Sequence, residues 1–333
     1  MSVLLSPSDA RALIWNALVG SGTSPRNAEY FTDAILDTEL SGLEGHGFYW
    51  LQYYCAHLLS GKVDGQVVPQ VKPLSDTSFR VDAGCGFAHP AIEVGFKYMI
   101  PAAKTHGIAA MGVYNSYNAA TLGFHTGYLA RAGLLALGAT NAVPNLAPVG
   151  GKRPIIGTNP ISYAVPAPNG EVSFLVDQSA TQVAWTAVKR AAEEGDPIPL
   201  GWALDAEGEP TTDAEAGLAG SMAPAGGVKG FSIGLFVEVL CAALAGGKLG
   251  LDQGSFTDDD GKPINNGQFF VAFDPGKFSG GSFDQTISKL VASITEQEGA
   301  RLPNARREAN KLRLSEQGIP IELKLYETLK DFA

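Results

Sequence analysis

The residue of this chain best suited to acid–base chemistry is His46, one of five histidines, which is followed directly by Gly47. A histidine changes charge close to neutral pH, so one that is held in place can act as a general acid. His46 lies between two stretches with helical spacing, and such a junction presents a side chain rigidly. Taken alone, the same residue could simply cap backbone carbonyls at a helix end.

A carboxylate is available to support this histidine. Asp177 follows the apolar run Phe174–Val176, which predicts a buried strand. A carboxylate at a strand end can orient an imidazole or hold a polar group of a substrate. The alternative is that Asp177 caps the helix that follows.

Two glycine-containing loops could cradle a nucleotide. Gly157-Thr158-Asn159-Pro160 is a tight turn where glycine allows close approach of a ligand and the polar residues supply hydrogen bonds. Gly226-Gly227-Val228-Lys229-Gly230 precedes an apolar helix, whose first N–H groups and lysine could bind an anion. A plain turn and helix packing explain these two segments equally well. Polar residues that resemble the rim of a site follow the run Ile108–Tyr114: Asn115, Ser116, Tyr117 and Asn118.

Apolar spacing predicts the helices that position His46. One helix begins at Ser24-Pro25, carries apolar residues three, four and seven apart, and ends at Gly42. A second follows His46 and ends at Gly61. Further helices are expected from Pro90 onward, over 188–194, over 229–245, over 287–294 and near 325–329.

Short apolar runs separated by Gly, Pro, Asn and Asp predict one central sheet. The runs are 79–81, 108–114, 134–140, 161–165, 174–176 and 269–273. We expect a helical part over residues 1–110 that carries the catalytic histidine, a central sheet over 111–280 that binds the nucleotide, and C-terminal helices over 281–333 that pack back on the first part.

Composition limits the class of protein. The net charge is −10 and no Lys/Arg-rich run is present, which argues against nucleic acid and anionic membranes as partners. The apolar stretch 231–247 contains Glu238 and is shorter than the roughly 20 residues of a membrane span. Three dispersed cysteines indicate a reducing compartment. A cytoplasmic protein is therefore expected.

Several motifs are missing. No GxGxxG follows a predicted strand, so a doubly wound dinucleotide fold has no support. No HExxH or CxxC spacing occurs, and no metal site is predicted. No nucleophile motif such as GxSxG is present either.

In their order and spacing, the motifs resemble the malate/L-lactate dehydrogenase-type oxidoreductases that do not use a Rossmann fold. The likeness runs from about residue 7 to 330 and rests on His46-Gly47, Asn115-Ser116, Pro148–Gly151, Gly157–Ile161, Asp177, Pro210–Asp213 and Gly226–Gly230. Within the family, Leu59–Gln66 and Val81–Ala91 are most similar to the branch of Δ1-piperideine-2-carboxylate and Δ1-pyrroline-2-carboxylate reductases.

The resemblance implies a mixed α/β fold, with a mainly antiparallel central sheet flanked by helices, and a homodimer with sites near the interface. It implies His46 as proton donor, supported by Asp177, and NADPH as cofactor, with NADH as the alternative. Cofactor contacts are expected from Thr140, Asn141, Gly157, Thr158, Asn159, Gln178, Ser179, Thr181, Lys229 and Gly230. Substrate contacts are expected from Trp50, Asn115, Ser116 and Tyr117.

The chain departs from the family pattern at three positions. Gly45 replaces a serine before the His-Gly pair, Trp50 replaces an arginine three residues after it, and Tyr117 replaces a histidine. These changes alter the usual grip on a substrate carboxylate but keep the acid.

The expected reaction is reduction of a cyclic ketimine carboxylate to L-proline or L-pipecolate, with His46 kept cationic by Asp177. Reduction of a 2-keto acid, as in a malate- or lactate-type dehydrogenase, fits the same layout. A nucleotide-binding protein without turnover is the third hypothesis.

Overall fold

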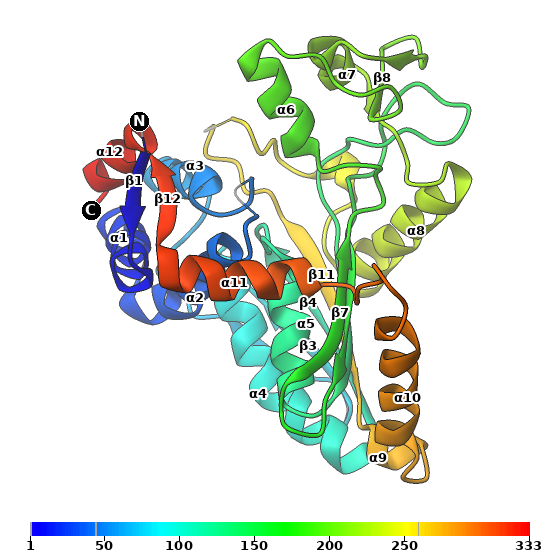
Figure 1. The fold of residues 1–333 in the computed structure, drawn as a ribbon. Helices are drawn as coiled ribbons and strands as arrows, with labels where there is room; N and C mark the ends of the chain where they lie inside the picture. The colour runs from blue at the N-terminus through cyan, green and yellow to red at the C-terminus, as the bar shows by residue number, and fades with distance from the viewer. Residues whose placement is uncertain (1, 44, 259) are drawn as a thin grey trace.

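The computed structural model describes residues 2–43, 45–258 and 260–333 (Figure 1). Its centre is a seven-stranded sheet with the order β2-β3-β4-β11-β5-β6-β7. The strands are β2 (Gln70–Pro73), β3 (Ser78–Asp82), β4 (Ile108–Ser116), β5 (Leu135–Thr140), β6 (Ile161–Pro166), β7 (Val172–Gln178) and β11 (Asn266–Phe273). β3 and β4 pair in parallel, and the other neighbours pair antiparallel. The predicted fold class is therefore confirmed.

The strand directions bring several loops to one end of the sheet. β4, β5 and β7 run the same way because each is separated from the next by one antiparallel strand. The segments after Ser116, Thr140 and Gln178 therefore leave the same end, where β6 and β11 begin. The polar segments 115–118, 140–141, 157–160 and 177–181, which the sequence analysis singled out, therefore lie at this end of the sheet.

Helices cover both faces of the sheet because its strands alternate their apolar residues. α4 (Ala88–His106) and α5 (Leu122–Arg131) cover one face, where Phe270 and Ala272 of β11 join the main core. α8 (Val228–Glu238) and a π-helical turn (Val239–Leu244) cover the other, where Phe269 packs. The single helix expected over 229–245 is thus divided in two.

The two chain ends form a second body beside the sheet (Figure 1). β1 (Ser2–Leu5) pairs antiparallel with β12 (Ile319–Glu322). Around this pair lie α1 (Pro7–Gly20), α2 (Pro25–Leu40), α3 (Phe48–Leu59), α11 (Ala305–Gln317) and α12 (Leu323–Asp331). α11 packs on α2, and α12 packs on α1 and α3. The central sheet itself already begins with β2 and β3, before the boundary expected at residue 110.

A small unit lies apart from the sheet, at the top of Figure 1. It consists of α6 (Trp185–Glu194), α7 (Ala214–Ala219) and the short sheet β10-β8-β9, formed by Ser221–Met222, Ala203–Leu204 and Pro210–Thr211. A 3-10 turn (Gly250–Asp252), α9 (Pro275–Phe278) and α10 (Phe283–Thr295) complete the chain. No helix within the described residues is both long and apolar enough to cross a membrane.

Two buried histidines lie where α2, α4 and α5 meet. His89 stacks on Phe31 with ring centroids 4.1 Å apart, and neither of its nitrogens has a hydrogen-bond partner in the described part of the chain. His125 lies 5.1 Å from it and contacts the Ala119 carbonyl at 3.2 Å. Burial lowers the pKa of His89 well below its ordinary value, and burial lowers that of His125 to about 4.

These histidines should make the fold sensitive to acid. Between about pH 6.5 and 4 the unfolded chain binds protons that the buried imidazoles reject, so stability falls as the pH drops through this window. For His125 alone this amounts to about 3 kcal/mol. His89→Leu should reduce the loss, measured by urea unfolding at pH 7 and pH 5. An equal loss in His89→Leu and in His106→Gln, which changes an exposed histidine, would contradict this assignment.

Candidate active site

A cavity of about 1010 Å³ lies at the loop-bearing end of the sheet. Small-molecule sites usually enclose roughly 300–1,000 Å³, so this cavity has room for a large cofactor with a small substrate. Its walls come from both bodies of the protein: the α2–α3 connection, the loops after β4, β5 and β7, the 250–257 segment and the start of α11. His46 and Asp177 both line it.

His46 owes its place to the glycine that follows it. Its backbone N–H donates to the Leu43 carbonyl at 2.8 Å, which closes a turn before α3. The buried Glu39 carboxylate accepts a hydrogen bond from the Phe48 N–H at the start of α3. A Cβ on Gly47 would lie 2.0 Å from that carboxylate, so only glycine leaves room for this cap. Gly47 thus permits the Glu39 cap at the start of α3, and this cap fixes the backbone next to His46.

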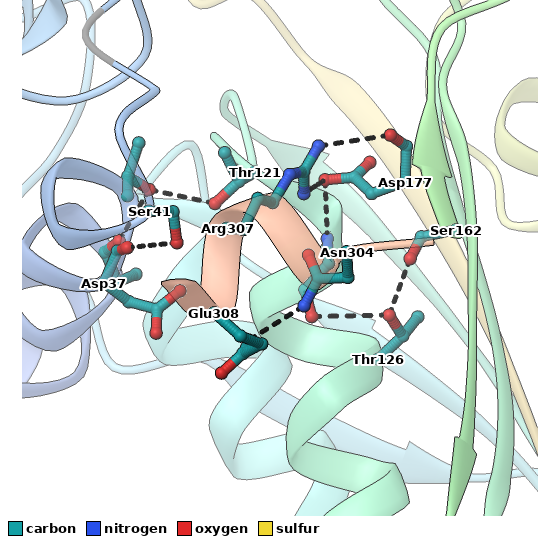
Figure 2. A network of polar contacts seen from close by, with 12 residues as sticks. Asp37, Ser41, Thr121, Thr126, Ser162, Asp177, Asn304, Arg307 and Glu308 are labelled. Carbon is teal, nitrogen blue, oxygen red and sulfur yellow. Dashed lines mark hydrogen bonds and ion pairs between the residues drawn. The ribbon is translucent and has the colours of Figure 1, made fainter. Parts of the chain in front are cut away.

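Asp177, at the end of β7, is held by two groups (Figure 2). Its Oδ2 accepts from the Gly123 N–H at 3.0 Å and from Arg307 Nη1 at 3.1 Å. Arg307 Nη2 also donates to the Asp177 carbonyl oxygen at 3.3 Å. Arg307 comes from the first turn of α11, so the C-terminal body contributes directly to the site.

The charge balance around His46 differs from the expected one. Burial lowers the pKa of His46; the Asp177 carboxylate opposes this effect, and the Arg307 guanidinium adds to it. Burial and Arg307 together outweigh Asp177, so the pKa of His46 lies below its ordinary value. A lowered pKa makes the protonated imidazole a stronger acid.

An aromatic surface lines the same cavity as His46. Trp50, on the first turn of α3, is buried and lines the cavity. The Phe256 ring packs edge-on against it, with centroids 4.8 Å apart, and lines the cavity as well. This surface occupies the position where the family pattern has an arginine.

The loops expected to bind the nucleotide also line the cavity. Six of the residues expected to contact a cofactor are among its lining: Thr140, Asn141, Thr158, Gln178, Ser179 and Thr181. The buried Glu238 of α8 ties these loops together. Its carboxylate accepts from Asn141 at 3.2 Å, from Asn159 at 2.7 Å and from the Gly250 N–H at 2.7 Å.

Other expected contacts lie outside the cavity lining. Tyr117 is buried, and its hydroxyl is hydrogen-bonded to His57 Nδ1. Asn115 donates to Asp82 at 3.0 Å, and Ser116 is buried in β4. Asn159 is buried with its amide bonded to Glu238, while Gly157 and Gly230 pack closely against backbone. Lys229 is exposed. These residues either pack in the protein interior or lie on the surface outside the cavity.

The lining residues that the sequence analysis did not single out include Arg306, Arg307 and Phe256. The two arginines lie on α11, whose strongly polar sequence gives little apolar periodicity to detect. Phe256 lies in an irregular segment. The adjacent arginine pair was the one available signal, since paired cations at a helix start often meet anions.

Comparisons with known proteins find similarity over nearly the whole chain. The family model for malate/L-lactate dehydrogenase matches residues 5–330. A (2R)-3-sulfolactate dehydrogenase (NADP(+)) of Chromohalobacter salexigens is 41% identical over 97% of this chain and 95% of its own. The Delta(1)-pyrroline-2-carboxylate reductase 1 of Burkholderia ambifaria is 35% identical over 98% and 96%.

Two solved structures have the same fold as this chain. The delta1-piperideine-2-carboxylate reductase of Pseudomonas syringae superposes with a TM-score of 0.93 at 31% identity, covering 99% of this chain and all of that one. The sulfolactate dehydrogenase of Methanocaldococcus jannaschii gives a TM-score of 0.90 at 26% identity, with 99% and 96% covered.

Proposed function

Since the chain belongs to the malate/L-lactate dehydrogenase family of NAD(P)-dependent oxidoreductases, we propose that it reduces a cyclic ketimine carboxylate with NADPH. The substrate would be Δ1-pyrroline-2-carboxylate or Δ1-piperideine-2-carboxylate, and the product L-proline or L-pipecolate. The site combines one candidate acid, His46, with a cavity large enough for both reactants.

The observation that carries the choice of substrate is the aromatic surface of Trp50 and Phe256 in the cavity that His46 lines. A cyclic ketimine offers an apolar ring and a single carboxylate, which such a surface accommodates. Sulfolactate and malate carry a second acidic group that would need a cation there. The two arginines that line the cavity within the described ranges are Arg306 and Arg307. With Arg307 assigned to the single carboxylate and Arg306 to a cofactor phosphate, neither remains for a second acidic group.

The cavity lining suits a dinucleotide. Hydroxyl groups of Thr140, Thr158, Ser179 and Thr181 and amides of Asn141 and Gln178 would hold its ribose and amide groups. Arg306 is exposed at the cavity wall and would meet a phosphate. When bound, the reduced nicotinamide supplies a hydride to the C=N carbon of the substrate.

The residues of this chain perform the proton chemistry. His46, once protonated, donates its proton to the ring nitrogen, because a protonated imine accepts a hydride far more readily than a neutral one. Asp177 stabilises the imidazolium by its charge. Arg307 uses two of its five N–H groups on Asp177 and has others left for the substrate carboxylate.

A second candidate is a 2-hydroxy-acid dehydrogenase, favoured by the 41% identity to the sulfolactate dehydrogenase. In that reaction His46 would protonate the alkoxide formed from a keto group. Oxidation of NADPH and NADH at 340 nm, with Δ1-pyrroline-2-carboxylate, pyruvate, oxaloacetate and 3-sulfopyruvate in parallel, separates the two. Turnover of the cyclic imine alone supports the proposal. Turnover of a keto acid alone refutes it, and nucleotide binding without any turnover leaves the protein a binding protein.

We further propose that the protein is a homodimer. α8 and the π-helical turn after it expose apolar residues to solvent in the single chain: Val228, Ile233, Leu235, Phe236, Val239 and Leu244. Leu251, exposed at 54%, lines the cavity wall. On α10, Leu290 of the expected stripe is exposed, and Ile287, Val291 and Ile294 are half-buried. Exposed apolar surface of this extent is typical of an interface.

Charging this surface should separate the subunits. Wild type should elute with twice the chain mass of 34.8 kDa in size-exclusion chromatography with light scattering. Phe236→Asp with Val239→Asp should elute as a monomer, because both side chains are about half exposed in the single chain. Leu312→Asp changes an exposed leucine of α11 and should stay dimeric. A monomeric wild type would refute the dimer.

A further inference from the structure

Lys62 is a buried lysine whose ammonium group binds Asp258 and Asp260 of one loop. Its side chain is fully buried, and Nζ donates to the Asp258 carbonyl oxygen at 2.5 Å and to Asp260 Oδ1 at 2.9 Å. Gly61, at φ +77°, ends α3 and turns the chain so that the Lys62 N–H bonds the His57 carbonyl at 2.9 Å. A buried ammonium is costly unless it is paired, so this arrangement needs both acceptors.

The loop that Lys62 holds forms one wall of the cavity. Of residues 253–258, named here the wall segment, Gln253, Ser255, Phe256 and Thr257 line the cavity. Phe256 packs on Trp50 and against the rings of His57 and Tyr117, at 5.6 and 5.4 Å between centroids. The wall segment therefore places one aromatic ring in the wall of the cavity that His46 also lines.

The wall segment contains no helix or strand beyond the end of the 3-10 turn. Backbone without a hydrogen-bond ladder depends on side-chain anchors for its position. Hydrogen bonds of Gln253 and Gly254 hold its start. Its second half is held by the packing of Phe256 and by Lys62. Asp260, which also binds Lys262 at 3.1 Å, links Lys62 to the next turn of the chain.

We propose that Lys62 is a positioning residue, which fixes the wall segment so that Phe256 and Trp50 together contact the apolar, non-reacting body of the substrate. The identification of this apolar part as the ring of a cyclic ketimine rests on the proposed function. The anchoring by Lys62 rests on the contacts above and holds for any substrate reduced at His46.

Lys62→Met tests this inference, because methionine keeps the length and apolar stem of lysine but removes the charge. Asp260 is partly exposed and can be solvated without its partner. Hydrogen exchange of peptides over 253–258 should become faster than in wild type. The kcat/KM for the substrate should fall roughly 10- to 100-fold, mainly through KM, because the wall is displaced. The dissociation constant for NADPH should stay unchanged.

Two further variants sharpen the experiment. Lys97→Met removes an exposed lysine paired with Glu93 and should match wild type in every measurement. Phe256→Ala removes the wall ring itself, so its KM effect and that of Lys62→Met should combine to less than their product. Should Lys62→Met fail to fold, Asp260→Asn weakens the same anchor and should raise KM and exchange in the same direction.

Unchanged exchange at 253–258, or faster exchange with unchanged KM, would overturn the proposal. A failure of the proposed function looks different: wild type would then reduce keto acids and no cyclic imine. In that case the exchange comparison and the KM for the accepted keto acid still decide the role of Lys62.

Discussion

Replacing His46 by glutamine should lower kcat/KM by roughly 10²- to 10⁴-fold, the range that a positioned general acid contributes. Glutamine can still donate a hydrogen bond into the cavity, but it cannot transfer a proton. The loss should appear in kcat, since the step that fails is the chemical one. Steady-state rates from NADPH oxidation at 340 nm measure it.

The controls for this variant test binding and fold separately. Nucleotide affinity, followed by NADPH fluorescence, should match wild type, because the expected cofactor contacts come from other loops. His106→Gln replaces an exposed histidine and should keep full activity. Near-normal turnover in His46→Gln would remove His46 from the mechanism and leave the cavity without its assigned acid.

Local patterns predicted the elements that carry the acid. Apolar residues at helical spacing place α2 and α3 within two residues of their observed bounds, and both glycines that end these helices adopt positive φ. The strands of the sheet follow from short apolar runs in the same way. His46 was found because it lies between two such elements, so its rigidity is a property of nearby sequence.

The rest of the site depends on contacts between distant segments. Arg307 reaches Asp177 across 130 residues, and Lys62 reaches Asp260 across 198. Pairing of β1 with β12 holds α11 in place, and neither strand has enough length for its apolar pattern to stand out. Tyr117 shows the opposite error: a polar residue at a strand end was expected at the rim, but its ring completes an aromatic core and its hydroxyl finds His57.

Asp177 and Arg307 should shift the pH dependence of activity in opposite directions. With His46 as acid, kcat/KM falls as the pH rises through the pKa of His46, which burial sets below its ordinary value. Arg307→Met removes a cation that lowers this pKa, so the falling limb should move to higher pH. Asp177→Asn removes an anion that raises it, so the limb should move to lower pH.

Opposite shifts separate electrostatic tuning from simple damage to the site. Either substitution breaks the same ion pair. A purely structural effect would therefore lower activity in both variants without separating the falling limbs of their pH profiles. Asp177→Asn should also lose more activity at neutral than at acidic pH, because less of its His46 is protonated at neutral pH. Arg307→Met should raise the KM for the carboxylate substrate while its limb moves upward. Shifts in the same direction would mean that a group other than His46 controls the pH profile. Opposite shifts are expected because Asp177 raises the pKa of His46 and Arg307 lowers it.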